Sequence, residues 1–150
     1  MSIFRTAKQV AFTELLVAVE ETVNDYIDLA KVLDGSAAAA VFGSFVQARK
    51  TIIEKLETEM RLLGDLPSPP NIDKEDLGKL VHRVRAAFAS DALHPALQEL
   101  LQDEQRTLEL ARACEKEELN QMESRIVADL VNQVEEAITR LQAMATNAAV

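Results

Sequence analysis

Apolar residues in the first 33 positions recur at spacings that alternate between four and three. The series consists of Phe12, Leu16, Val19, Val23, Tyr26, Ala30 and Leu33. This spacing places the side chains in one stripe along a helix, which is how a helix packs against partners around a core. Comparable stripes lie in residues 37–63, 95–118 and 122–144. A chain with four such stripes must bury all of them, so the sequence predicts an all-α fold of long helices that face one another.

The breaks between these segments indicate how the helices connect. Asp34, Gly35 and Ser36 separate the first helix, expected over residues 6–33, from the second. Gly35 suits the left-handed conformation that ends many helices, and Ser36 suits the N-cap of the next one. A connection this short forces the two helices into an antiparallel hairpin. The second helix is expected to stop at Gly64.

Residues 65–73 form the only expected linker, because the prolines in the sequence DLPSPPNID exclude a continuous helix. A shorter helix is predicted over residues 74–89, and a break follows at His94 and Pro95. Together these segments predict an antiparallel four-helix bundle, with a short extra helix between the second and third long helices. Residues 1–150 are expected to form a single domain.

Charge and cysteine usage exclude several classes of function. Sixteen Lys and Arg against 25 Asp and Glu give a net charge of −9, so phosphate backbones and anionic lipid would repel the chain. We therefore expect neither nucleic acid nor membrane among its partners. No apolar run approaches the roughly 18 residues of a membrane span, and the N-terminus does not resemble a signal peptide. A cytoplasmic location is expected, in which Cys114, the single cysteine, would be a buried and inert thiol.

Two charged residues occupy positions where the stripes call for apolar ones. Glu104 lies in the stripe that contains Leu100 and Thr107, and Arg49 lies in the stripe that contains Phe45 and Ile52. Charges at such positions are costly unless they are paired. We expect Glu104 and Arg49 to form an internal ion pair, with Glu21 as a further acidic partner. A partial metal site and solvent-facing side chains remain the alternatives.

The metal alternative follows from the chemistry of di-iron helical bundles. These use one glutamate from each of two helices and a Glu-x-x-His pair from each of the other two. Glu104 is a counterpart for one bridging glutamate, Glu21 could turn inward from the first helix, and Glu135 is available in the last. Carboxylate oxygen and imidazole suit iron or manganese. Glu21, Glu104 and Glu135 are therefore the candidate metal ligands.

The expected ligand set is incomplete, which favours a protein without a cofactor. The only histidines, His82 and His94, lie in the predicted short helix and at its break, away from the middle of the bundle. Arg49 occupies a position where a ligand would be needed, and a guanidinium cannot bind a cation. No Ser-His-Asp arrangement, glycine-rich phosphate loop or CxxC motif is present, so no catalytic residue can be named. His82 also lacks the lysine and glycine expected shortly after a phosphoryl-accepting histidine.

From Leu15 to Met144 the chain resembles a family of bacterial ferritin-like domain proteins of unknown function. The matching features are Glu21 with Tyr26, Arg49 with Leu56 and Leu63-Gly64, the proline-rich linker, Leu80-Val81-His82-Arg83, and Gln102-Asp103-Glu104. The resemblance implies a ferritin-like fold and a stress-related setting, but no reaction. A histidine that is frequent in the last helix of that family falls at Glu135 here. This departure puts oxidase or iron-storage activity in doubt.

Two functions from different classes are consistent with these observations. The first is a non-enzymatic, acidic bundle protein that acts by association with itself or with another protein. A homodimer is expected, because Ile3, Phe4 and Val10 form an apolar N-terminal segment that needs cover. The second is a carboxylate-bridged iron- or manganese-binding protein, such as a ferroxidase or an iron store. The incomplete ligand set favours the first.

Overall fold

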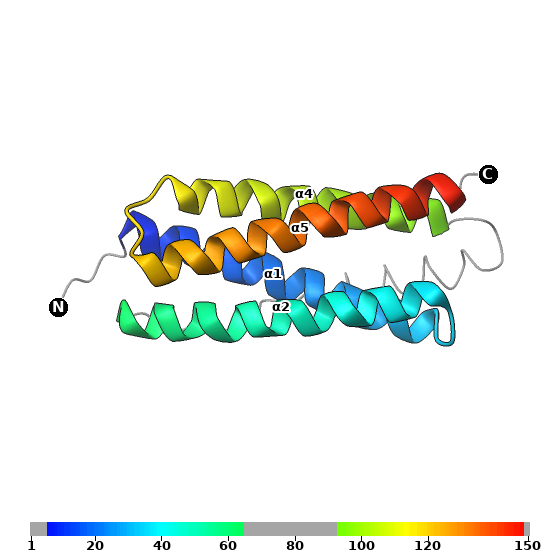
Figure 1. Cartoon of the computed structure of the whole chain (residues 1–150), viewed down its shortest axis with the longest axis horizontal. Coiled ribbons are helices and arrows are strands. Elements are labelled where there is room, and N and C mark those ends of the chain that lie inside the picture. Colours follow the sequence, from blue (N-terminus) through cyan, green and yellow to red (C-terminus); the bar gives the residue numbers. More distant parts are fainter. Residues whose placement is uncertain (1–5, 65–92, 149–150) are drawn as a thin grey trace.

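The structure, a computed structural model, describes residues 6–64 and 93–148. Within these ranges the chain forms four helices and no strand: α1 (Ala7–Val32), α2 (Ala37–Leu62), α4 (Leu93–Glu115) and α5 (Gln121–Ala148). Figure 1 shows them lying along one another as an elongated bundle, in which the chain turns back between α1 and α2. The all-α class predicted from the apolar spacing is confirmed.

The helix ends follow from capping residues. Thr6 and Gln9 form a capping box at the start of α1, in which each side chain accepts a hydrogen bond from the other residue's backbone N–H. Ser36 caps α2 by accepting from the backbone N–H of Ala39 at 3.1 Å. Gly35 and Gly64 have φ angles of 83° and 82°, which only glycine adopts without strain. The turn and stop signals in the sequence are therefore correct.

Each helix packs along two others, and this packing sets the cross-section of the bundle. α1 packs against α2 and α4, and α5 packs against α4 and α2. α2 and α4 therefore occupy diagonal corners, as do α1 and α5. Between them lies a single apolar core to which all four helices contribute. Its most deeply buried large side chains include Phe12, Leu15, Leu16, Tyr26, Leu29, Phe42, Ile52, Leu56, Leu100 and Leu130.

The observed helices differ from the expected ones at a few places. α4 begins at Leu93, before Pro95, because proline is tolerated in the first turn of a helix, and it ends at Glu115. α5 continues to Ala148, so the tail expected to fray from residue 147 is helical for two residues further. Ala30 is only half-buried, whereas Leu29 beside it is fully buried. The expected linker and short helix, residues 65–73 and 74–89, lie outside the described residues.

Polar contacts hold the helices together at the end of the bundle where α1 begins. Lys8 Nζ lies 3.0 Å from Glu123 Oε1 at the start of α5 and 3.2 Å from the carbonyl oxygen of Glu118. Gln9 Nε2 donates to the carbonyl oxygen of Leu63 at 2.9 Å, just after α2. Asn120 and Glu123 cap α5: the side chain of each accepts a hydrogen bond from the backbone N–H of the other. The start of α1 is thus tied to both α2 and α5.

In the part of the chain described, no helix is both long and apolar enough to cross a membrane.

Candidate functional site

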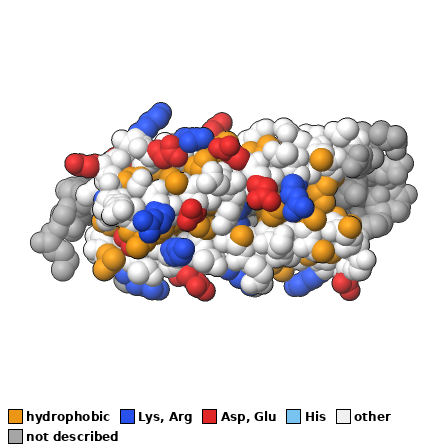
Figure 2. Space-filling model, in the orientation of Figure 1, with side chains coloured by type: hydrophobic (Ala, Val, Ile, Leu, Met, Phe, Trp, Pro, Cys, Tyr) orange, Lys and Arg blue, Asp and Glu red, His pale blue; other side chains and the backbone are white. Residues whose placement is uncertain are grey.

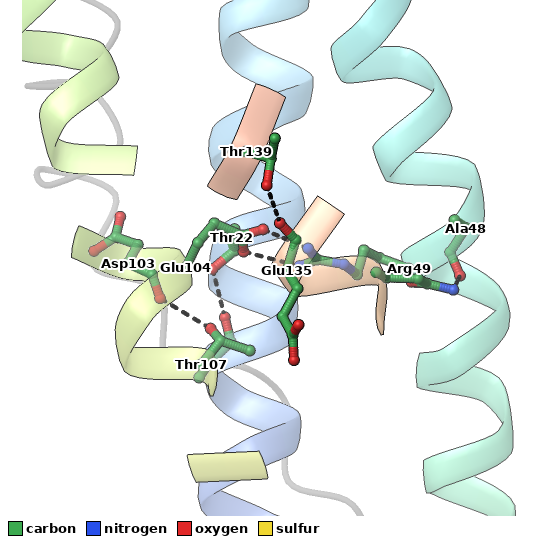
Figure 3. A network of polar contacts seen from close by, with 10 residues as sticks. Thr22, Ala48, Arg49, Asp103, Glu104, Thr107, Glu135 and Thr139 are labelled. Atoms are coloured by element: carbon green, nitrogen blue, oxygen red, sulfur yellow. Dashed lines mark hydrogen bonds and ion pairs between the residues drawn. The ribbon is translucent and has the colours of Figure 1, made fainter. Parts of the chain in front are cut away.

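The middle of the bundle holds the ion pair between Arg49 of α2 and Glu104 of α4. The guanidinium binds the carboxylate through both of its terminal nitrogens: Arg49 Nη1 donates to Glu104 Oε1 at 2.9 Å, and Nη2 donates to Oε2. The two side chains are 1% and 0% exposed, so the pair is withdrawn from water. Figure 3 shows the contact spanning from α2 toward α4. Because these helices lie at diagonal corners, the long arginine side chain reaches across the interior.

The pairing changes the electrostatics of Arg49. Burial alone would lower the pKa of the guanidinium, but the hydrogen bonds and negative charge of Glu104 outweigh burial and raise it. The pair is therefore a charged one. Two charges in a dry interior are retained only when geometry is good and every polar atom is satisfied. The twofold contact meets that condition at the carboxylate, because each oxygen accepts from a guanidinium nitrogen.

Tyr26 of α1 lies next to the ion pair. Its ring packs against Phe42 and Phe45 with centroid separations of 5.4 Å each. Burial raises the pKa of the phenol well above its usual value, and the nearby charge of Glu104 raises it further. The hydroxyl is buried and lies close to the carboxylate of Glu104. Tyr26 is therefore a neutral neighbour of the pair at physiological pH.

Two buried threonines close to the pair are satisfied by their own helices. Thr107 Oγ1 donates to the carbonyl oxygen of Asp103 at 3.0 Å, and Thr22 Oγ1 donates to that of Ala18 at 2.9 Å (Figure 3). Such back-bonding satisfies the hydroxyl proton without a partner on another helix. It explains why α4 tolerates Thr107 at a fully buried position of its stripe.

The structure does not bring the three candidate metal ligands together. Glu21 does not turn inward: its side chain is exposed and lines a small cavity between α1 and α4. Glu135 is also exposed, and its Oε1 lies 3.0 Å from Arg112 Nη2 on the surface. Only Glu104 is in the interior, and both of its oxygens are bound by Arg49. Among residues 6–64 and 93–148, no three His, Cys, Asp or Glu side chains are grouped to hold a metal ion. These donors do not fit an iron or manganese centre.

Two pairs of carboxyl groups, which the apolar pattern did not reveal, lie between the helices. Asp25 of α1 and Asp103 of α4 line the same small cavity. Burial first, and then Asp103, raises the pKa of Asp25 to about 7. Glu20 of α1 faces Glu57 of α2, and burial followed by Glu57 raises the pKa of Glu20 to about 7. Each residue borders a stripe, so finding the pairs requires knowing how the helices are aligned.

Two further hollows lie between helices in the described part of the chain. The first, between α2 and α5, has a volume of about 150 Å³, well below the 300–1,000 Å³ of typical ligand pockets. The second is a groove of about 820 Å³ between α4 and α5. None of the described side chains that line the groove is an acid, a lysine or an arginine; they are His94, Gln98, Leu101, Gln102, Gln105, Gln142, Ala145 and Thr146.

The remaining candidate side chains are structural. Cys114 is fully buried, and burial raises the pKa of its thiol to about 12, so the thiolate needed for reactivity does not form near neutral pH. The burial of this thiol, expected from the sequence, is confirmed. His94 Nδ1 lies 3.0 Å from the carbonyl oxygen of Ala145, which links α4 to α5. His82 lies outside the described residues.

No protein-family model, curated protein or solved structure matches this chain. The resemblance to ferritin-like domain proteins therefore rests on the sequence motifs alone. Of the residues in those motifs, Tyr26, Arg49 and Glu104 come together in the interior, whereas Glu21 is on the surface. The family assignment stays a prediction.

Proposed function

We propose that the chain is an antiparallel, ferritin-like bundle that works without a metal and acts by association, first of all with a second copy of itself. The observation that carries the first half is the Arg49–Glu104 pair. A di-iron bundle would need a free carboxylate at the centre. Here the central carboxylate is neutralised by a guanidinium that binds both of its oxygens.

Metal titration tests directly whether the protein works without a metal. The full chain, purified without chelators, is analysed for iron and manganese and then titrated with Fe²⁺ and Mn²⁺ by calorimetry. We expect less than stoichiometric metal and no saturable site. Glu104→Gln should change stability without changing metal content. Stoichiometric binding that Glu104→Gln abolishes would refute the proposal and favour the carboxylate-bridged alternative.

The groove between α4 and α5 supports the proposal that the chain associates with a second copy of itself. Two copies with a net charge of −9 repel each other wherever charged faces meet. The cores of protein interfaces are depleted in charged residues, and this groove is lined by uncharged side chains. Figure 2 shows acidic and basic side chains distributed over much of the face that it displays. The groove is therefore the surface on which a second copy would meet least repulsion.

Glutamine-to-glutamate substitutions test the groove. Gln102→Glu and Gln105→Glu add charge to its lining with little change in shape. Gln47→Glu, on the exposed side of α2, is the matched control. Light scattering over a wide concentration range should give a dimer mass for the parent chain and the control, and a monomer mass for the groove variants. A monomeric parent chain at every concentration would refute self-association and leave another protein as the partner. A dimer that the groove variants leave intact would place the interface elsewhere.

A further inference from the structure

Helix α1 has a pair of facing carboxyl groups on each of its two packed sides. Toward α4, Asp25 and Asp103 line a cavity of about 60 Å³ together with Glu21. Toward α2, Glu20 faces Glu57, and Glu20 Oε2 is buried without a hydrogen-bond partner in the described chain. One member of each pair lies on α1 and the other on the neighbouring helix. Like charges would therefore meet across both interfaces of α1 if all four groups were ionised.

Basic groups do not cancel this repulsion. Arg106 of α4 lines the same cavity as Asp25 and Asp103, and Arg61 of α2 lies 3.9 Å from Glu57. Arg106 lowers the pKa of Asp103, but neither arginine is among the causes that shift the pKa of Asp25 or Glu20. Glu21 and Asp28, on α1 itself, add further negative charge near Asp25. The cations near the two pairs are therefore weaker neighbours than the opposing carboxyls.

A bound proton converts the repulsion within each carboxyl pair into attraction. A protonated carboxyl donates a hydrogen bond to the carboxylate opposite, so the pair attracts as long as it holds one proton. Burial first, and then the facing acid, raises the pKa values of Asp25 and Glu20 to about 7. Burial also raises the pKa of Asp103. Asp25 and Glu20 therefore exchange their protons near neutral pH.

We propose that the two carboxyl pairs form a proton-operated latch on α1. With one proton in each pair, the second half of α1, residues 20–32, is held to α2 and α4. Loss of both protons places like charges across both interfaces and loosens this half. The first half stays attached through the contacts of Lys8 and Gln9 with α5 and the end of α2. The latch is independent of metal binding and of self-association.

The direction of the pH effect follows from linkage. In the unfolded chain these carboxyls have ordinary pKa values near 4, whereas those of Asp25 and Glu20 in the folded chain are about 7. Between these limits the folded protein binds more protons than the unfolded one. The stability that the latch contributes is therefore fully present below about pH 4. It is lost as the pH rises through about 7, the folded pKa of both groups.

Urea unfolding of the full chain at pH 5.5 and pH 8.0 tests the latch. A three-unit shift corresponds to about a thousandfold change in the unfolding constant, but these groups are partly exposed, so screening reduces it. We expect the unfolding constant of the parent chain to rise at least about tenfold between the two values. The double variant Glu20→Gln and Asp25→Asn, which imitates the protonated state, should change less than about threefold. Asp129→Asn, at an exposed position of α5, is the matched control and should retain the parent's dependence.

Two measurements on the parent chain keep the test independent of how the variants fold. Carbon NMR of the side-chain carboxyls should show Asp25 and Glu20 titrating near pH 7. Amide exchange, corrected for intrinsic rates, should show residues 20–32 losing protection between pH 6 and 8 before α5 does. Titration of both carboxyls near pH 4, or a double variant with the parent's pH dependence, would overturn the proposal.

Discussion

The centre of the bundle and the flanks of α1 both place carboxylates between helices, but the two regions treat them in opposite ways. At the centre, Glu104 meets a guanidinium from the diagonal helix in a site withdrawn from water. At the flank, Asp103 meets another aspartate from the adjacent helix at the edge of a small cavity. Asp103 and Glu104 are consecutive residues of α4, and a helix turns about 100° per residue. That rotation directs one carboxylate into the core and the other to the α1 interface.

The difference shows what decides whether a buried carboxylate is ionised. A partner that supplies opposite charge and two donors keeps the charge in the core, although the cost of removing water is high. A partner of the same charge leaves protonation as the only way to lower the energy. The centre should therefore be insensitive to pH near neutrality, whereas the flank should respond to it. Each of the following predictions separates the two regions further.

The largest effect is expected at the centre. Glu104→Leu leaves the Arg49 charge buried and unpaired, and Arg49→Met does the same to Glu104. Each single variant should lose about 3–5 kcal/mol of unfolding free energy, while the double variant should lose much less than the sum. A double-mutant cycle by urea unfolding measures this coupling. Small and additive losses would show that the two side chains act independently of each other.

The second effect concerns Glu123, which is a buried carboxylate with opposite-charge and backbone partners at the bundle's end. It accepts from Lys8 Nζ at 3.0 Å and from the Asn120 backbone N–H at 2.9 Å. Glu123→Ala removes the cap and leaves the Asn120 N–H unpaired, while Lys8 keeps only its contact with the carbonyl oxygen of Glu118. We expect a loss of about 1–3 kcal/mol. Thermal unfolding measures it, with Glu136→Ala on the exposed face of α5 as control. Equal effects of the two substitutions would contradict a structural role for the cap.

The third prediction concerns a substitution that gives the α1 flank an opposite-charge pair, as at the centre. Asp103→Lys replaces the like-charge pair with Asp25 by an opposite-charge one. We expect the pKa of Asp25 to fall from about 7 toward its ordinary value. At pH 8 the unfolding free energy should rise by up to about 1 kcal/mol, the usual range for a partly exposed pair. Carbon NMR titration of Asp25 and urea unfolding check both parts. An unchanged Asp25 titration would show that burial alone sets its pKa.

The smallest effect is expected at the surface pair of Arg112 and Glu135. The two side chains are 53% and 52% exposed, so their 3.0 Å contact should contribute almost nothing. Glu135→Ala should change the unfolding free energy by less than about 0.5 kcal/mol. Urea unfolding at low and high salt measures it beside Glu104→Leu. A loss comparable to that of Glu104→Leu would mean that Glu135 has an interior role after all.

The site was predictable in one respect and not in others. A charge in an otherwise apolar stripe needs a partner, and Arg49 occupies a comparable position in another stripe. Periodicity therefore made the ion pair the favoured interpretation over a partial metal site or solvent-facing side chains. Glu21 and Glu135 were less predictable, because they border their stripes and a small rotation decides whether they face inward. Both face solvent. The Asp25–Asp103 and Glu20–Glu57 pairs depend on the relative alignment of two helices, which no single stripe contains.

The sequence by itself determined the helices, because their stripes, the caps at Thr6 and Ser36, and the glycines at 35 and 64 act over a few residues. It also determined that Arg49 and Glu104 must be buried together or not at all, since neither charge is tolerated alone in a core. Beyond the pairing of α1 with α2, which their short connection dictates, only the tertiary structure decided which helices are neighbours and which are diagonal. That arrangement depends on how four apolar stripes close around one core. It places opposite charges across the centre and like charges along both sides of α1.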